Sequence, residues 1–128
     1  MSKRILLTAS LFGAIAVIFG AFGAHSLKNV LSSGSLEIWA KGVEYQFYHT
    51  FALLFLAQFA AEDDPLVKWT YRFFTMGIVF FSGSLYLLAT RDILNIGFVN
   101  FIGPVTPIGG LCFILGWSLL FFAALKRK

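Results

Sequence analysis

The segment ILLTASLFGAIAVIFGAFGA, from Ile5 to Ala24, contains no charged side chain. A helix needs about 20 mainly apolar residues to cross the hydrocarbon core of a bilayer, because that core is ~30 Å thick and each residue rises ~1.5 Å. The segment has this length and this composition. It therefore predicts a transmembrane helix, and it decides how the rest of the chain is interpreted.

Three further stretches have the same character. Phe73 to Thr90 is uncharged, and Val43 to Ala61 carries a single charged residue, Glu44. Ile93 to Leu125 is also uncharged, but glycines and prolines interrupt its first half, so we expect a helix only from about Ile108 onward. The chain therefore predicts an all-α integral membrane bundle of four transmembrane helices, at approximately residues 5–24, 43–61, 71–90 and 108–125.

The composition of the whole chain supports a membrane protein. Of its 128 residues, 59% are hydrophobic and 12% are charged, and the mean hydropathy is +0.83. These values do not fit an ordinary soluble domain, and we expect residues 1–128 to form a single membrane domain. Because Lys3 and Arg4 precede the first apolar segment, a cleavable signal peptide is the alternative there, but the apolar run is long for one.

The basic residues indicate the orientation in the membrane. The net charge of +4 would suggest nucleic acid in a soluble protein, but here lysine and arginine lie mostly at the ends of apolar segments, so we expect no nucleic-acid partner. With four spans, the side that holds both termini has Lys3, Arg4, Lys68, Arg72, Lys126, Arg127 and Lys128, and the other side has Lys28, Lys41 and Arg91. This excess predicts that both termini are cytoplasmic.

The connections between the spans differ in character. The stretch Leu27 to Lys41 has apolar residues on both sides of a serine-rich break, and it predicts a short interfacial helical segment between spans one and two. The stretch Arg91 to Pro107 is apolar and rich in helix breakers, so it has to pack on the bundle or dip into it. The sequence is compatible with either arrangement of this third connection.

Small residues recur along span one, at Ala9, Gly13, Ala16, Gly20 and Ala24. Small side chains let two helix backbones approach closely, and in lipid such packing holds helices together. We therefore predict that span one lies at the centre of the bundle.

Polar residues concentrate in the outer half of the predicted bundle. Antiparallel spans place the end of one beside the start of the next, so His25 and Glu44 lie at a similar depth. An ionisable side chain left in hydrocarbon is costly and is usually buried against a partner. The cluster has two interpretations: a small polar binding pocket, or a lock that holds the helices together. Its candidate residues are His25, Glu44, Tyr45, Gln46, His49, Tyr86 and Arg91.

Motifs for metal binding or catalysis are not recognisable in the sequence. The two histidines lack a metal-ligand spacing, and Glu44 and Asp92 are the only plausible carboxylates at their level. No serine, cysteine or threonine has a recognisable base and orienting partner. We therefore predict no metal, no cofactor and no enzymatic activity.

Four segments together resemble one family of membrane proteins. They are GAFGAHSL at 20–27, YQFYHTFALL at 45–54, FSGSLYLL at 81–88 and PIGGLCFILGW at 107–117. Over nearly its whole length the chain resembles the YgdD/YwdK-like family of small four-span membrane proteins of unknown function, which is widespread in bacteria and has relatives in animals. The resemblance implies a four-helix bundle in the bacterial inner membrane, and it implies no activity. It marks as motif positions His25, Tyr45, Gln46, His49, Ser82, Gly83, Tyr86, Pro107, Gly109, Gly110, Gly116 and Trp117.

These features predict a class of protein rather than an activity. The favoured hypothesis is a non-enzymatic membrane protein, either an accessory subunit or a binder of lipid or another small amphiphile through the outer polar cluster. The alternative is a subunit of an oligomeric small-solute transporter or channel, because four short spans need several copies to enclose a path. A membrane enzyme built around His25, Glu44 and His49 is the least favoured hypothesis. The predicted partners are membrane lipid and further copies of the chain or a larger membrane complex.

Overall fold

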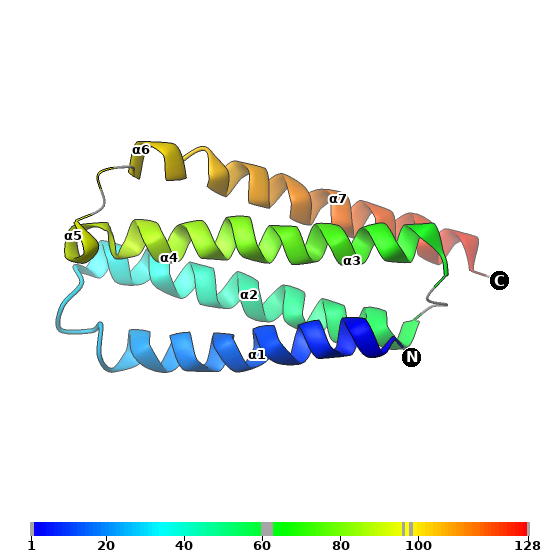
Figure 1. Cartoon of the computed structure of the whole chain (residues 1–128), viewed down its shortest axis with the longest axis horizontal. Coiled ribbons are helices and arrows are strands. Elements are labelled where there is room, and N and C mark those ends of the chain that lie inside the picture. Colours follow the sequence, from blue (N-terminus) through cyan, green and yellow to red (C-terminus); the bar gives the residue numbers. More distant parts are fainter. Residues whose placement is uncertain (1, 60–62, 96, 98, 128) are drawn as a thin grey trace.

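The computed structural model describes residues 2–59, 63–95, 97 and 99–127, and within these residues the chain is helical and contains no strand. Figure 1 shows long helical rods that alternate in direction, with both termini at one end of the bundle. The predicted all-α class is confirmed. The helices are α1 (Lys3–Ala24), α2 (Ser33–Phe59), α3 (Pro65–Gly77), the π-helix η1 (Ile78–Ser82), α4 (Gly83–Ala89), α5 (Arg91–Leu94), α6 (Val99–Ile102) and α7 (Val105–Lys126).

Among the described residues, three helical stretches are long and apolar enough to cross a membrane: Lys3–Ala24, Pro65–Ala89 and Val105–Lys126. The second of these is α3, η1 and α4 taken together as one helix. Helix α2 has 27 residues and so has the length, but charged and polar side chains between Glu37 and His49 make it less apolar. Length and composition therefore support three of the four predicted spans.

The start of α2 differs from the prediction. The separate interfacial segment expected between Leu27 and Lys41 is not formed, because α2 begins at Ser33 and continues without a break to Phe59. The Ser32 hydroxyl accepts a hydrogen bond from the backbone N–H of Ser35 at 3.2 Å. Serine is a favoured residue for capping a helix N-terminus, so the serine-rich stretch that suggested a break is a helix start.

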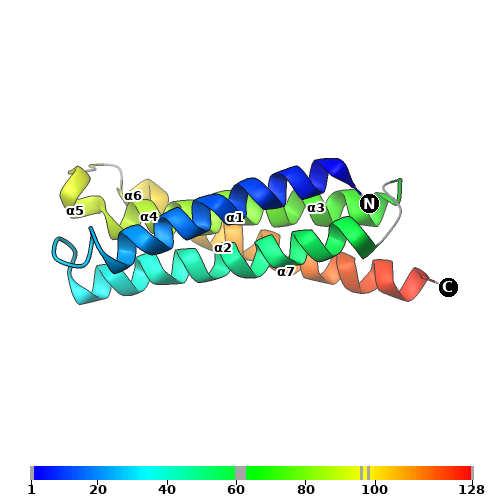
Figure 2. The ribbon, with the colours of Figure 1, turned by 90° about the horizontal axis from the view of Figure 1, so that it is seen from below.

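Helix α1 lies at the edge of the bundle, alongside α2 (Figures 1 and 2). Its small residues Ala9 and Ala16 are fully buried, whereas Leu7 and Val17 are 61% and 62% exposed. The prediction that this span lies at the bundle centre is wrong, because its small residues pack against one neighbouring helix, α2. Helix α2 contacts α1, α3, η1 and α4 and is the central helix instead.

Close backbone packing joins α7 to the helix formed by α3 and η1. A Cβ atom added at Gly109 would overlap the backbone nitrogen of Phe81, and one added at Gly116 would lie 2.6 Å from the Phe74 ring. Glycine is therefore required at both positions for the helices to approach this closely. Gly109 meets the chain inside η1, where one extra residue widens the helical turn.

Candidate functional site

Gln46 connects three helices from the centre of the bundle. Its side chain is 2% exposed. The amide Nε2 donates to the Phe12 carbonyl of α1 at 2.8 Å, and the amide Oε1 accepts from the Tyr86 hydroxyl of α4 at 2.6 Å. Both ends of the amide are therefore engaged, and the side chain ties α2 to α1 and to α4.

His49 lies one turn further along α2 and is also buried. The Trp117 indole N–H of α7 donates to His49 Nε2 at 3.0 Å. Because the indole nitrogen is only a donor, Nε2 carries no proton, and Nδ1–H donates to the Tyr45 carbonyl at 2.8 Å. The ring stacks on Phe113 with centroids 3.5 Å apart. This histidine is a neutral tautomer whose two nitrogens both have partners.

Two further residues complete what we call the interhelical network, formed by Trp39, Gln46, His49, Ser82, Tyr86 and Trp117. The Trp39 indole N–H donates to the Phe19 carbonyl of α1 at 2.8 Å, and its ring lies 4.8 Å from that of Tyr86. The Ser82 hydroxyl, at the end of η1, donates to the Gly42 carbonyl of α2 at 2.7 Å. Each bond joins two different helices.

A sequence signal for this network exists on α2, where the buried residues of one face recur at alternating spacings of three and four. Such a spacing marks the buried face of a helix. It runs from Trp39 into the apolar core. The residues are Trp39, Gly42, Gln46, His49, Leu53 and Leu56.

The predicted polar cluster is only partly brought together. Tyr45, Gln46, His49 and Tyr86 pack between helices, and the Tyr45 ring lies 4.7 Å from that of Phe81.

The other three candidates lie outside the network. His25 is exposed at the C-terminal end of α1. Glu44 is exposed and accepts a hydrogen bond from Lys41 at 3.3 Å. The Arg91 guanidinium donates to the Leu88 carbonyl at 3.3 Å. Among the described residues, no group of three or more His, Cys, Asp or Glu side chains could hold a metal ion.

A groove opens between α1 and α2 beside this network, near the end of the bundle opposite the termini. Its volume is about 420 Å³. Most of its lining is small or apolar, Trp39 forms part of the wall, and Glu44 contributes a carboxylate. We call it the α1–α2 groove, and it is lined by Gly20, Gly23, Ala24, Leu36, Trp39, Ala40, Val43 and Glu44.

Comparison with known proteins identifies the family. A model described as "Protein of unknown function (DUF423)" matches residues 19–110. The chain belongs to this family. Its relatives include a UPF0382 membrane protein of Staphylococcus saprophyticus, 41% identical over 97% of this chain and 98% of the relative. No solved structure matches the chain.

Two further relatives are YwdK and YgdD, after which the family that the sequence resembles is named. The UPF0382 membrane protein YwdK of Bacillus subtilis is 35% identical over 97% of this chain and 98% of its own length. The UPF0382 inner membrane protein YgdD of Escherichia coli is 38% identical over 99% of this chain and 93% of its own length. The resemblance is confirmed, and the chain is an integral membrane protein. The matched region of the family model contains the network residues except Trp117.

Proposed function

We propose that the protein is a non-enzymatic, four-span membrane protein that binds a lipid or another small amphiphile in the α1–α2 groove. The observation that carries the proposal is the groove itself, about 420 Å³ of space between two lipid-facing helices. Gly20, Ala24 and Ala40 leave room along its floor for an alkyl chain. Glu44 and the neighbouring Lys41 form an ion pair of 3.3 Å, which offers both charges to a zwitterionic headgroup.

The interhelical network supports this function by holding the groove in shape. Trp39 lines the groove, and its bond to the Phe19 carbonyl fixes α1 against α2 on that wall. Gln46 and His49 use their polar atoms on internal partners. A catalytic base needs an atom within reach of a substrate, so these bonds favour a structural role for the pair over an enzymatic one.

The four-span topology is supported by the course of α2. This helix runs antiparallel to α1 along its length, and its C-terminal end and the start of α3 lie at the end that holds both termini (Figure 1). We propose that α2 crosses the membrane as the second span and that both termini face the cytoplasm of a bacterial inner membrane. The basic residues at that end support this orientation.

The alternative, a subunit of a transporter, has less support from the bundle interior. Leu53, Leu56 and Phe74 fill the space between the helices and are at most 1% exposed. A solute path would therefore have to form between copies of the chain.

The groove is tested by filling it with a larger side chain. A Cβ at Gly20 meets only Val43, at 3.6 Å, so Gly20→Phe should fold and extend into the groove. Ile18→Phe is the matched control, because Ile18 lies on the same helix outside the groove and is 51% exposed. We expect native mass spectrometry with added phosphatidylethanolamine to show lipid loss in Gly20→Phe alone. Equal lipid retention in both variants, with equal melting temperatures, would reject the groove as a binding site.

A further inference from the structure

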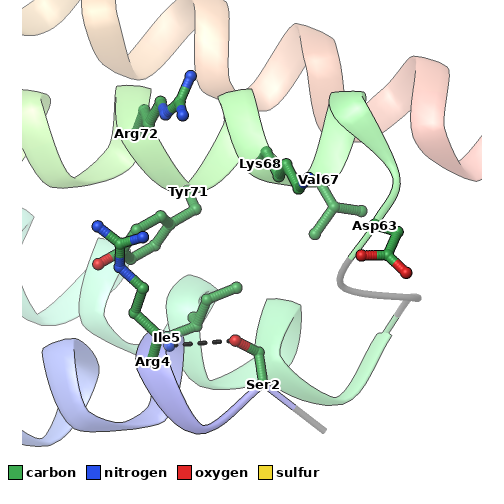
Figure 3. Close-up of a pocket in the computed structure, with 8 residues that line it drawn as sticks. All are labelled: Ser2, Arg4, Ile5, Asp63, Val67, Lys68, Tyr71 and Arg72. Atoms are coloured by element: carbon green, nitrogen blue, oxygen red, sulfur yellow. Dashed lines mark hydrogen bonds between the residues drawn. The ribbon is translucent and has the colours of Figure 1, made fainter.

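A second pocket opens at the other end of the bundle, where both termini lie. It has a volume of about 370 Å³ and lies between the start of α1 and the start of α3 (Figure 3). Arg4 approaches from α1, and Tyr71 approaches from α3 opposite it. We call it the basic pocket, and it is lined by Ser2, Arg4, Ile5, Asp63, Val67, Lys68, Tyr71 and Arg72.

Cations outnumber anions around the basic pocket. Arg4, Lys68 and Arg72 line it together with one carboxylate, that of Asp63. Among the described residues, ion pairs join Lys41 to Glu44 and Lys126 to Asp64, so none of the three pocket cations is paired. All three are exposed. Their charge is therefore available to an anionic ligand.

Two of the three pocket cations lie over aromatic rings. The Arg4 guanidinium lies 5.9 Å from the centre of the Tyr71 ring, and the Tyr71 hydroxyl is hydrogen-bonded to Thr8 at 2.7 Å. The Arg72 guanidinium lies 4.7 Å from the Trp69 ring, which places it at the margin of the pocket. Arg4 of α1 and Lys68 of α3 line the pocket itself, so a ligand inside it would meet both cations.

An adjoining groove extends the pocket toward the lipid-facing side of α1. It has a volume of about 490 Å³, shares Arg4 and Tyr71 with the pocket, and is also lined by Lys3, Leu7 and Thr8. Leu7 is 61% exposed and faces away from the bundle. A ligand that occupies both spaces needs an anionic head and an apolar tail. A free phosphate ion would use only the first space.

We propose that the basic pocket binds the headgroup phosphate of an anionic phospholipid from the membrane leaflet next to the termini. Arg4 and Lys68 bind the phosphate oxygens, and one acyl chain lies along Leu7 in the adjoining groove. Arginine suits this role because its planar fork can donate two parallel hydrogen bonds to phosphate. This site is separate from the α1–α2 groove, and it does not depend on which leaflet faces the cytoplasm.

The test measures lipid selectivity of the purified full-length protein. Native mass spectrometry in a neutral detergent compares retention of phosphatidylglycerol with that of phosphatidylcholine. We expect the unmodified chain to prefer phosphatidylglycerol, and we expect Arg4→Gln and Lys68→Gln each to reduce that preference about fivefold. Arg4→Lys keeps the charge but loses the two parallel hydrogen bonds of the guanidinium, so its preference should fall between that of the unmodified chain and that of Arg4→Gln.

Lys28→Gln is the matched control, because it removes one exposed cation at the opposite end of the bundle. Equal loss of the preference in Lys28→Gln would show that net charge, and not this pocket, selects the lipid. Displacement of phosphatidylglycerol by inorganic phosphate in excess would show a free-anion site and would overturn the lipid assignment. A melting curve for each variant separates loss of binding from loss of folding.

Discussion

The indole N–H of Trp117 donates a hydrogen bond to Nε2 of His49 at 3.0 Å and thereby joins α7 to α2. Helix α7 packs mainly on α3 and η1, so this bond adds a contact to a third helix, α2. In a membrane, helices are not held together by the hydrophobic effect, and such bonds together with close packing decide which helices associate. The pair therefore fixes α7 relative to the central helix.

Trp117→Phe tests this link. The substitution keeps an aromatic ring but removes the donor, so His49 Nε2 is left without its partner. We expect a loss of about 0.6–2 kcal/mol in stability, the usual range for an interhelical hydrogen bond in a membrane. Thermal unfolding in detergent measures the loss. Trp69→Phe is the control, because Trp69 and Trp117 are each 47% exposed; equal shifts in melting temperature would show that the bond contributes nothing.

The two adjacent glycines of α7 provide a second test. A Cβ at Gly109 would overlap the backbone of Phe81, whereas a Cβ at Gly110 would meet only the Phe81 ring at 3.9 Å. We expect Gly109→Ala to cost about 1–3 kcal/mol, because backbone atoms have to move. Gly110→Ala should be neutral or slightly stabilising, since alanine favours a helix over glycine by roughly 0.5–1 kcal/mol. Similar melting temperatures for the two variants would contradict the close packing at η1.

Hydropathy predicts the apolar helices well, and it fails where a helix continues through charged residues. The first and last predicted spans, 5–24 and 108–125, correspond to α1 (Lys3–Ala24) and α7 (Val105–Lys126). The second was expected to start at Val43, but α2 starts at Ser33. Charged residues such as Glu37 and Lys41 end an apolar run without ending a helix. The boundary therefore needed the capping signal of Ser32 rather than hydropathy.

From the sequence, the candidate residues could be assigned a depth along the bundle but not a direction around each helix. Glu44 precedes Gln46 by two residues, a rotation of about 200° at 3.6 residues per turn. Gln46 is consequently buried while Glu44 faces outward. The π-helix η1 was not predicted from the sequence, and its residues Phe81 and Ser82 contact α7 and α2, which are distant in sequence.

The bond between Tyr86 and Gln46 can be measured with a double-mutant cycle. Tyr86→Phe removes the donor and Gln46→Met removes the acceptor, and each single variant leaves a buried polar group unpaired. We expect the double variant to be less destabilised than the sum of the singles, by about 0.5–2 kcal/mol. Urea or thermal unfolding of the four proteins gives this coupling energy. If the destabilisation of the double variant equals the sum of the two single effects, the 2.6 Å contact contributes nothing to stability.

Repeating the cycle with Tyr48→Phe provides its control. Tyr48 lies on the same helix as Gln46 but is 53% exposed, and it packs against the Tyr45 ring instead. We expect Tyr48→Phe and Gln46→Met to be additive. Coupling of equal size in both cycles would mean that Gln46→Met disturbs α2 as a whole.

The number of spans is decided by labelling three exposed positions, Ser33, Asp63 and Arg127, each changed singly to cysteine in a Cys112→Ala background. If α2 crosses the membrane, Asp63 and Arg127 lie on the cytoplasmic side and Ser33 on the external side. If only α1, the helix Pro65–Ala89 and α7 cross, all three positions share one side, because α2 then returns without crossing. A membrane-impermeant maleimide applied to intact cells should therefore label Ser33→Cys alone, and permeabilised cells should show labelling at all three. Labelling of Ser33→Cys and Arg127→Cys from the same side would contradict the four-span topology and leave α2 as a helix on the membrane surface.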